Sequence, residues 1–496
     1  MNTDEIIAKG IKASTAKGRG LYSLIPTIML VMTVSLLFAC GGGSSSPATS
    51  ESVVARGVIT QLGSIWVNGV EYETPKGGSY SSGDNPIDPA SYEVGQVVNL
   101  RGRLNDDSVS GIADEVEYEA EIKGTAGPDN VINGVTIITD IILVIGTRYE
   151  VSGFWLNENT IEATFIKIDN EGFDEVKGIV QAPNSDPLAL TVLGVTYTYS
   201  GIPVVSIGDL VEIHFNPANK IASRVELEDD FFDNLDDGQK AEREGAVNMD
   251  PTDLAACPTG AKFLIGPTCI DWDSVPSDGW MDGLTDNNDM MSGLRVEAEG
   301  HFNADGLLIA EKIKGRGNRV RISAFASNIG SDTFDVFGGA IQITTRSGLT
   351  SIEDILIDGD GFEIRGIRTD ATSPTVLALR IKSDNSVDST KHRLRAKVDI
   401  NGVDSSSPNI VTVMGISSQV GPSTKLEDED TLIAPGNGTA ENVIDDFLKS
   451  IDDDGIVNTT NGPNDVIDVR IDTSSGDGSF GSPYAAKQIE IEREDD

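Results

Sequence analysis

The sequence is poor in the side chains that most often build catalytic and metal sites. It has three cysteines and three histidines among 496 residues. The histidines, His214, His301 and His392, have no second histidine or cysteine at metal-ligand spacing. No Gly-x-Ser-x-Gly elbow, phosphate-binding loop or dinucleotide fingerprint is present, and the many carboxylate pairs single out no glycosidase pair. We therefore interpret the histidines as incidental surface or strand-edge residues and predict that the protein is not an enzyme.

Basic residues are also scarce. Lysine and arginine number 37 against 79 aspartates and glutamates, which gives a net charge of -42. A nucleic-acid-binding surface needs positive charge to displace counterions from phosphates, so the sequence predicts no nucleic-acid partner. The acidity is typical of an exposed, well-solvated surface and, as an alternative, of cation binding. Hydrophobic residues make up 39% of the chain, which is enough for packed cores.

The chain begins with a segment typical of export. Four basic residues precede an apolar run over 21–39, which ends in the sequence LFAC, whose cysteine is Cys40. This ending resembles a bacterial lipobox, in which the signal peptide is cleaved before a cysteine that then carries lipid. We predict a signal peptide over 1–39, membrane attachment through lipid on Cys40, and a flexible tether over 40–51. An uncleaved membrane helix is the alternative, because the run is nearly long enough to span a bilayer.

The predicted location is the cell envelope. No acidic residue follows Cys40 directly, which by resemblance to lipoprotein sorting signals favours the outer membrane, with the periplasmic and surface faces both open. The remaining two cysteines, Cys257 and Cys269, form an even pair in an oxidising compartment, and we predict a disulfide between them. Closing a loop of that length contributes about 3 kcal/mol in the chain-entropy description. Two free thiols are the alternative.

One hairpin pattern recurs about six times along the chain. The version at 207–227 alternates apolar and polar residues through two strands joined by a turn. The residues of this version that we expect in the core are Leu210, Ile213, Val225 and Leu227.

A second repeated piece lies upstream of each hairpin. It is a strand that often passes through a glycine, such as Gly57, followed by two short apolar strands around a turn such as Asn68-Gly69. The Asn-Gly dipeptide accepts the positive φ of a tight two-residue turn. Each unit therefore consists of three strands, a variable connection and two further strands.

Five short strands without a long covering helix close most economically into a small barrel. In two units the connection looks helical, at 350–356 and 440–451. A helix between the third and fourth strands is the OB-fold arrangement, so we predict an all-β chain of six tandem, five-stranded OB-like barrels. The predicted units are 52–119, 120–170, 174–228, an acidic linker at 229–240, 241–316 with an insertion at 250–291, 319–384 and 392–494.

A lipobox followed by such units resembles a family of exported bacterial proteins catalogued only as a domain of unknown function. The resembling motifs are x-x-Gly-x-Val, Val-Asn-Gly-Val-x-Tyr, Val-Gly-Asp-x-Val-Glu-Ile and Ala-x-x-Val-Glu, and they are clearest at 57–72, 178–227 and 293–313. The resemblance implies tandem small β-barrels. It implies no catalytic residues, because the family has no assigned activity.

An acidic loop near the C-terminus offers oxygen ligands for calcium. Ser450, Asp452, Asp454 and Asn458 follow a predicted helix and partly match an EF-hand loop. The bidentate acid is missing, since Asn461 stands where glutamate is expected. Ordinary solvated Asp/Gly turns are the alternative reading.

A complete repeat architecture without an assembled catalytic group favours a non-enzymatic, lipid-anchored envelope protein that acts as a spacer or binding scaffold. The alternative is a surface lipoprotein that binds carbohydrate or a protein, for which Trp272 and Trp280 in the predicted insertion are the candidate contacts. An envelope hydrolase is the third hypothesis. Alternatively, the two tryptophans have no ligand and only pack within the predicted insertion.

Overall fold

A computed structural model describes most of the chain after the predicted tether. The described residues are 51–83, 85–139, 141–170, 172–185, 188–199, 205–228, 231–232, 235–282, 284–317, 319–347, 349–369, 374–388, 390–398, 403–404, 409–428, 431–432, 466–476, 478–479 and 482–492. The predicted signal peptide, Cys40, the predicted helix at 440–451 and the predicted calcium ligands Ser450, Asp452, Asp454 and Asn458 lie outside these residues.

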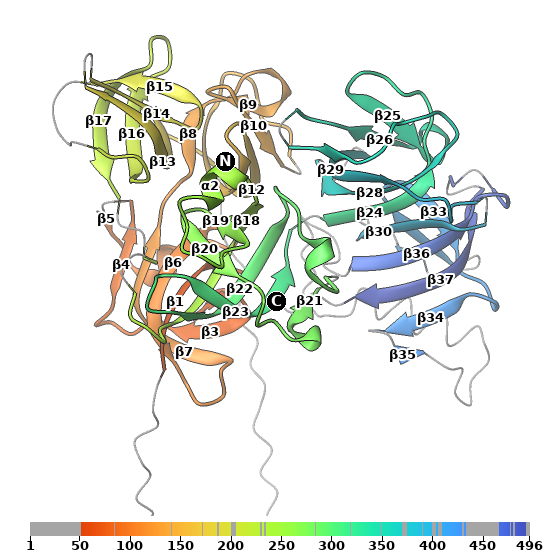
Figure 1. The fold of residues 1–496 in the computed structure, drawn as a ribbon, viewed down its shortest axis with the longest axis horizontal. Helices are drawn as coiled ribbons and strands as arrows, with labels where there is room; N and C mark the ends of the chain where they lie inside the picture. The colour runs from red at the N-terminus through yellow and green to blue at the C-terminus, as the bar shows by residue number, and fades with distance from the viewer. Residues whose placement is uncertain are drawn as a thin grey trace, which may run out of the picture. The chain divides into compact units, whose positions relative to one another are not determined.

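The described chain is almost entirely β-structure and forms small five-stranded barrels, as predicted (Figure 1). Barrel 1 contains β1 (Glu51–Val58), β2 (Ile65–Val67), β3 (Val70–Glu73), β4 (Ser79–Ser82), β5 (Asn85–Pro86), η1 (Pro89–Ser91), β6 (Val97–Leu104) and β7 (Ser110–Tyr118). Barrel 2 contains β8 (Ile122–Thr125), η2 (Pro128–Asn130), β9 (Val131–Ile132), β10 (Val135–Ile138), β11 (Arg148–Asn157) and β12 (Thr160–Ile168). Barrel 3 contains β13 (Asp174–Ser185), β14 (Leu188–Val192), β15 (Val195–Thr198), β16 (Leu210–Asn216) and β17 (Ile221–Leu227).

The second half of the chain follows the same plan. Barrel 4 contains β18 (Lys240–Asn248), α2 (Pro251–Leu254), β19 (Phe263–Ile265), β20 (Thr268–Asp271), η3 (Ser277–Gly279), β21 (Trp280–Met281), η4 (Asn287–Asp289), β22 (Arg295–Phe302) and β23 (Leu308–Gly315). Barrel 5 contains β24 (Arg319–Phe325), β25 (Thr333–Val336), η5 (Phe337–Gly339), β26 (Ile341–Thr344), β27 (Ser351–Ile352), β28 (Gly361–Arg368) and β29 (Thr375–Ser383). Barrel 6 contains β30 (His392–Lys397), β31 (Val403–Asp404), β32 (Ile410–Val413), β33 (Ile416–Gln419), β34 (Lys425–Asp428), β35 (Thr431–Leu432), β36 (Val466–Asp472) and β37 (Tyr484–Glu492).

The strand order within barrel 1 is that of an OB fold. β1 pairs antiparallel with β6, β6 with β7, and β2 with β3, while β3 runs parallel to β7. A bridge between Ile59 and Val67 brings the end of the first strand to the second. The parallel pairing of third and fifth strands recurs as β10 with β12, β15 with β17, β20 with β23, β26 with β29 and β33 with β37.

The predicted helix at 350–356 is wrong. The structure has the short strand β27 there, which runs parallel to β29 in the register Ser351 to Arg380. β4, β21 and β34 occupy the same place in their barrels and pair with β7, β23 and β37. The connection between the third and fourth strands therefore extends the sheet in four barrels, because a strand there satisfies backbone groups on the fifth strand.

The repeated glycine and the Asn-Gly turn are one structural device. Asn68 has φ 56° and its side-chain amide donates to the carbonyl oxygen of Arg56 at 3.3 Å. A Cβ on Gly57 would lie 1.9 Å from Asn68 Oδ1, so only glycine admits this contact. Barrel 2 repeats the arrangement with Asn133 and Gly124. In both barrels the asparagine side chain therefore holds the turn against the first strand through a hydrogen bond.

The barrels are joined in pairs through their first strands. β1 pairs with β18 in parallel, β8 pairs with β13 antiparallel, and β24 pairs with β30 antiparallel. Barrel 1 is thus bonded to barrel 4, barrel 2 to barrel 3, and barrel 5 to barrel 6, in sheets of 13, 10 and 14 strands. The 2–3 pair is nested in the sequence between the two members of the 1–4 pair.

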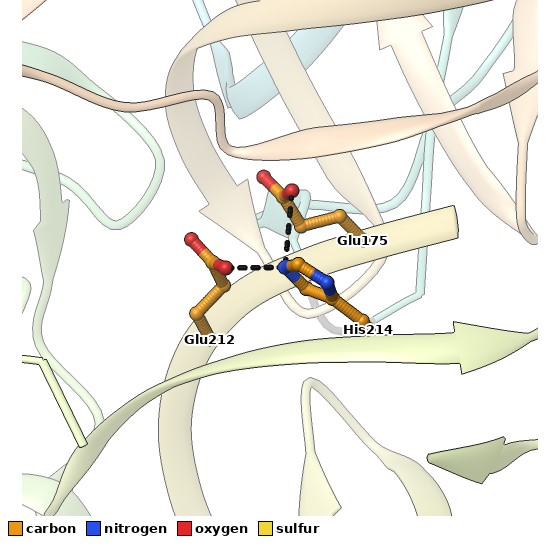
Figure 2. Close-up of side chains that lie close together, drawn as sticks. All are labelled: Glu175, Glu212 and His214. Atoms are coloured by element: carbon orange, nitrogen blue, oxygen red, sulfur yellow. Dashed lines mark hydrogen bonds and ion pairs between the residues drawn. The ribbon is translucent and has the colours of Figure 1, made fainter. Parts of the chain in front are cut away.

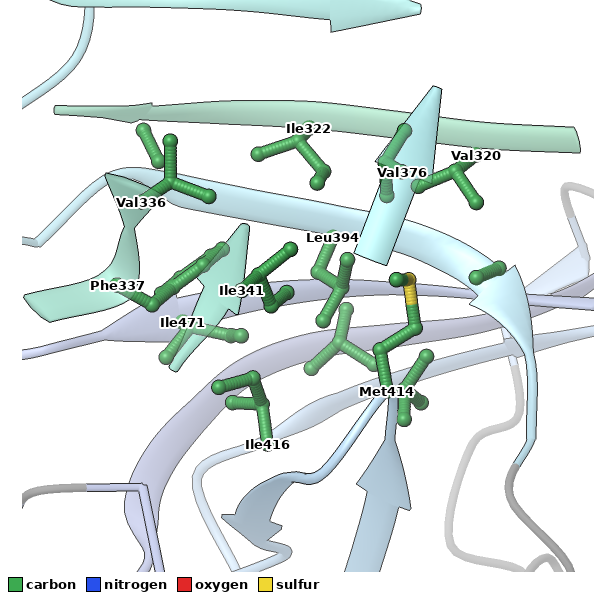
Figure 3. Packing of buried hydrophobic residues seen from close by; sticks show 14 of the residues in the cluster. Val320, Ile322, Val336, Phe337, Ile341, Val376, Leu394, Met414, Ile416 and Ile471 are labelled. Atoms are coloured by element: carbon green, nitrogen blue, oxygen red, sulfur yellow. The ribbon is translucent and has the colours of Figure 1, made fainter. Parts of the chain in front are cut away.

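The hydrophobic cores follow this pairing only for barrels 5 and 6. Barrels 1, 2 and 3 each have a separate cluster of buried residues, and the cluster centred on barrel 4 includes residues of barrels 1, 2 and 5. One cluster of buried residues runs through barrels 5 and 6, and Figure 3 shows Ile322 and Val336 of barrel 5 in the same cluster as Met414 and Ile471 of barrel 6. All four side chains are fully buried, with 0% of their surface exposed. Burying such side chains stabilises the fold by roughly 2 kcal/mol each.

Two of the four predicted core residues in the hairpin of barrel 3 are wrong. Ile213 and Val225 are buried, but Leu227 is 51% exposed and Leu210 is only half-buried. Residues 210 and 213 are an odd number apart, so a regular strand places them on opposite faces.

The predicted insertion at 250–291 and linker at 229–240 differ from the structure. The insertion range contains β19 and β20, the second and third strands of barrel 4, which pair with β18 and β23. In the linker, Phe231 and Phe232 are buried, with the guanidinium groups of Arg101 and Arg243 over their rings at 4.2 and 4.4 Å. Among the described residues no helix is long and apolar enough to cross a membrane.

Ile213 and Leu227 provide a matched test of the register. Ile213→Asp places an unpaired charge at a fully buried position, so we expect the free energy of unfolding of barrel 3 to fall by about 4 kcal/mol or more. Leu227→Asp, at an exposed position of the same hairpin, should change it by less than about 0.5 kcal/mol. Calorimetric melting of the purified chain measures both, and equal effects of the two substitutions would show that the register is incorrect.

Candidate functional site

Polar side chains on β8 of barrel 2 and on β13 and β16 of barrel 3 are largely buried where these two barrels meet. Glu175 on β13 lies directly opposite Lys123 on β8 and opposite His214 on β16. Lys177 on β13 lies opposite Glu212 on β16. Side chains two apart on a strand share a face, so these five charged or titratable groups form one patch.

Three of these side chains converge on one point, as Figure 2 shows. His214 Nε2 lies 2.5 Å from Glu212 Oε1 and 3.5 Å from Glu175 Oε2. Exposed fractions are 8% for His214, 8% for Glu212 and 3% for Glu175. A buried imidazole therefore faces two buried carboxylates through the same ring nitrogen.

Neighbouring side chains hold this cluster in place. The ring of Phe173 stacks on His214 with centroids 4.1 Å apart. Lys123 Nζ lies 3.0 Å from Glu175 Oε2 and 5.7 Å from the centre of the Phe173 ring. The ammonium group supplies the positive charge that a buried carboxylate requires.

The environment shifts the titration of the two carboxylates in opposite directions. Burial raises the pKa of Glu175 to about 7, and the charge of Glu212 adds to this effect while Lys123 and His214 oppose it. Burial also acts to raise the pKa of Glu212, but the hydrogen bond and charge of His214, with Lys123 and Lys177, bring it below its usual value. The two glutamates are thus chemically different members of one cluster.

A second group of carboxylates surrounds Lys177. Glu117, Glu119 and Glu228 bring one oxygen each within 4.8 Å of one another. Lys177 forms ion pairs with Glu119 and, at 3.5 Å, with Glu228. Burial lowers the pKa of Lys177. This arrangement is an ion-pair network whose centre is already occupied by an ammonium group.

A further buried charged face lies where barrels 1 and 4 meet. Glu242 on β18 lies opposite Glu299 on β22, and Glu244 lies opposite Glu297. Glu242 is 3% exposed, and its Oε2 accepts no hydrogen bond among the described residues. Burial, followed by the charges of Glu297 and Glu299, raises the pKa of Glu242 to about 8, although Lys240 and Lys314 act to lower it.

The predicted site residues of barrel 4 lie close together. Cys257, which follows α2, forms a disulfide with Cys269 on β20. Trp272 stacks on Phe263 with centroids 5.4 Å apart and lies 6.3 Å from Trp280. Both tryptophans are half-buried and pack against the hydrophobic cluster centred on barrel 4. Their rings thus contact one another and the core.

The interpretation of the histidines as surface residues is wrong for two of the three. His214 is buried in the cluster, and His392 is 4% exposed and packs against Phe325 and Phe337. Only the side chain of His301 retains substantial exposure, at 34%.

Sequence reasoning missed Glu175 and Glu212, because carboxylates are so common in this chain. One signal was present: in Glu212-Ile-His214 the two polar residues are two apart on a predicted strand and must share a face. The repeat pattern also identified the first and fourth strands of each unit. These two strands pair in barrel 3, which places Glu175 opposite His214.

Comparisons with known proteins identify one family segment. Residues 280–314 match the family described as "Domain of unknown function (DUF5666)", which agrees with the resemblance to a family without assigned activity. These residues cover β21 to β23 of barrel 4. No curated protein matches the chain.

Among solved structures, the chain is similar to a "multidomain protein with nucleic acid binding domains" from Streptococcus pneumoniae. The identity is 10%, the match covers 43% of this chain and 74% of that chain, and the TM-score is 0.11. This finding contradicts the partner prediction, which excluded nucleic acid on the basis of chain-wide acidity, and we withdraw that exclusion. A likeness at this TM-score carries no argument for nucleic-acid binding by this chain.

Glu242 makes the stability of the protein depend on pH. Its folded-state pKa of about 8 lies above the usual pKa of a glutamate, near 4.5, so the folded protein retains a proton that the unfolded chain releases. Stability therefore falls as the pH rises from about 4.5 to about 8. We expect Glu242→Gln to melt like the wild type near pH 5 and to be more stable by roughly 4 kcal/mol above pH 8.

Thermal unfolding across this pH range measures the effect. Glu73→Gln, at an exposed position on β3, is the matched control and should keep the pH dependence of the wild type. A Glu242→Gln variant with the wild-type pH profile would contradict the assignment of this dependence to Glu242.

Proposed function

We propose that this protein is a non-enzymatic, lipid-anchored component of the bacterial cell envelope whose linked barrels act as a spacer or binding scaffold. The observation that supports this most is the pairing of first strands between barrels, β1 with β18, β8 with β13 and β24 with β30. A scaffold must hold its modules at fixed spacing, and backbone hydrogen bonds between modules do so better than flexible linkers.

Ion pairs between barrels of different pairs add to this support. Arg56 of barrel 1 lies 2.6 Å from Glu121 of the 2–3 pair, and Arg295 of barrel 4 lies 3.6 Å from Glu162 of barrel 2. Glu121 and Glu162 are buried. Separating these barrels would leave buried carboxylates without their charged partners, which would lower the stability of the protein.

The lipid anchor and the outer-membrane location rest on the sequence at Cys40 and on the apolar run before it. The tether over 40–51 would connect the lipid to the first barrel. The alternative role in carbohydrate or protein binding has less support, because the rings of Trp272 and Trp280 contact one another and the core of barrel 4.

Replacing Cys40 tests the anchor. With the chain expressed in a bacterium that processes lipoproteins, we expect the wild type to take up labelled palmitate and to sediment with membranes. Cys40→Ser should take up no label and leave the membrane fraction. Cys257→Ser, at a cysteine engaged in a disulfide, is the control and should keep the label. A wild type without label, or Cys40→Ser that stays with membranes, would contradict the proposal.

A further inference from the structure

We propose that Glu175, Glu212 and His214 form a binding site for a divalent transition-metal ion of the zinc type. The geometric reason is that two carboxylate oxygens approach the same imidazole nitrogen. His214 Nε2 lies 2.5 Å from Glu212 Oε1 and 3.5 Å from Glu175 Oε2, and the three atoms converge as Figure 2 shows. A single N–H proton serves one acceptor well, whereas a metal ion bonds to all three atoms.

The spacing of the donor atoms suits a small ion. Zinc binds imidazole nitrogen and carboxylate oxygen at about 2.0–2.1 Å in tetrahedral geometry, which puts ligand atoms about 3.3–3.4 Å apart. The separation of 3.5 Å between His214 and Glu175 is already close to this value. The separation between His214 and Glu212 has to open by about 0.8 Å, which a glutamate achieves by side-chain rotation.

The donor types select the class of ion. One imidazole and two carboxylates form a mixed nitrogen and oxygen set that suits zinc and its neighbours in the first transition row. Calcium prefers six to eight oxygen ligands and magnesium keeps several waters, so neither matches three converging donors of this kind. A water molecule would complete four-coordination.

His301 shows that this geometry is not a general property of histidines beside glutamates in this chain. His301 also contacts two carboxylates, but Glu51 approaches its Nε2 at 3.3 Å and Glu311 approaches its Nδ1 at 3.2 Å. The two carboxylates face opposite ring nitrogens and cannot share one ion with the ring. His301 is therefore a matched control for His214.

Lys123 competes with the metal ion. Its ammonium group lies 3.0 Å from Glu175 Oε2, one of the three donor atoms. Binding of a divalent ion releases the Nε2 proton to solvent and brings a second positive charge close to Lys123. Removal of that ammonium group should tighten metal binding, whereas in a purely structural ion-pair cluster it would leave Glu175 unpaired without creating affinity for metal.

Isothermal titration of the chelator-treated full chain with zinc chloride tests the proposal, with excess Mg²⁺ present to occupy weak acidic surface sites. We expect one tight zinc ion per chain. His214→Gln should weaken this site by at least about a hundredfold, His301→Gln should leave it unchanged, and Lys123→Met should strengthen it by about tenfold. Co²⁺ bound in place of zinc should give the visible absorption of a tetrahedral site in the wild type and not in His214→Gln.

Three results would overturn the proposal: no tight site in the wild type, equal zinc affinity in His214→Gln and the wild type, or loss of the site in His301→Gln. Circular dichroism establishes that each variant is folded. If His214→Gln does not fold, Lys123→Met decides the question, because an unchanged or weakened zinc affinity in that variant contradicts a site that includes Glu175.

Discussion

Charged side chains buried between barrels are the constraint on which the arrangement of this protein depends. Glu121 of the 2–3 pair is 7% exposed and lies 2.6 Å from Arg56 of barrel 1. Glu175 is held in the same way by Lys123 in the 2–3 pair. Removing one member of such a buried pair costs about 3–5 kcal/mol, because the other charge is left without compensation. Separating barrels that share such a pair therefore destabilises the protein.

The sequence predicted the individual barrels because their signals are local. Alternating strands, Asn68-Gly69 and the glycine at position 57 specify hairpins through short-range sterics, and the structure has these elements where they were expected. The helix predicted at 350–356 failed because a short strand, β27, gains backbone hydrogen bonds from β29 that a local pattern does not reveal. Leu227 failed for a related reason, since an apolar side chain at a strand end is also tolerated on the surface.

The pairing of barrels and the candidate site could not be predicted from one sequence. Alternation separates core residues from polar ones, but Glu175, Glu212 and His214 look the same whether their face meets water or another barrel. Which first strands pair depends on contacts across long stretches of chain, such as Val54 with Ala241. The buried carboxylates and the histidine are exceptions to the rule that polar strand faces are solvated, and such exceptions are where binding chemistry is expected.

The central claim is that the first strand of barrel 1 pairs with the first strand of barrel 4 and not with the first strand of barrel 2, its neighbour in the sequence. Ile313→Ala opens a cavity in barrel 4, where Ile313 is 0% exposed, and should destabilise that barrel by about 3 kcal/mol. Hydrogen exchange followed by mass spectrometry then measures which other strands lose protection. The claim predicts faster exchange in β1 of barrel 1 and unchanged exchange in β16 and β17 of barrel 3. Unchanged exchange in β1, or equal losses in barrel 3, would contradict it.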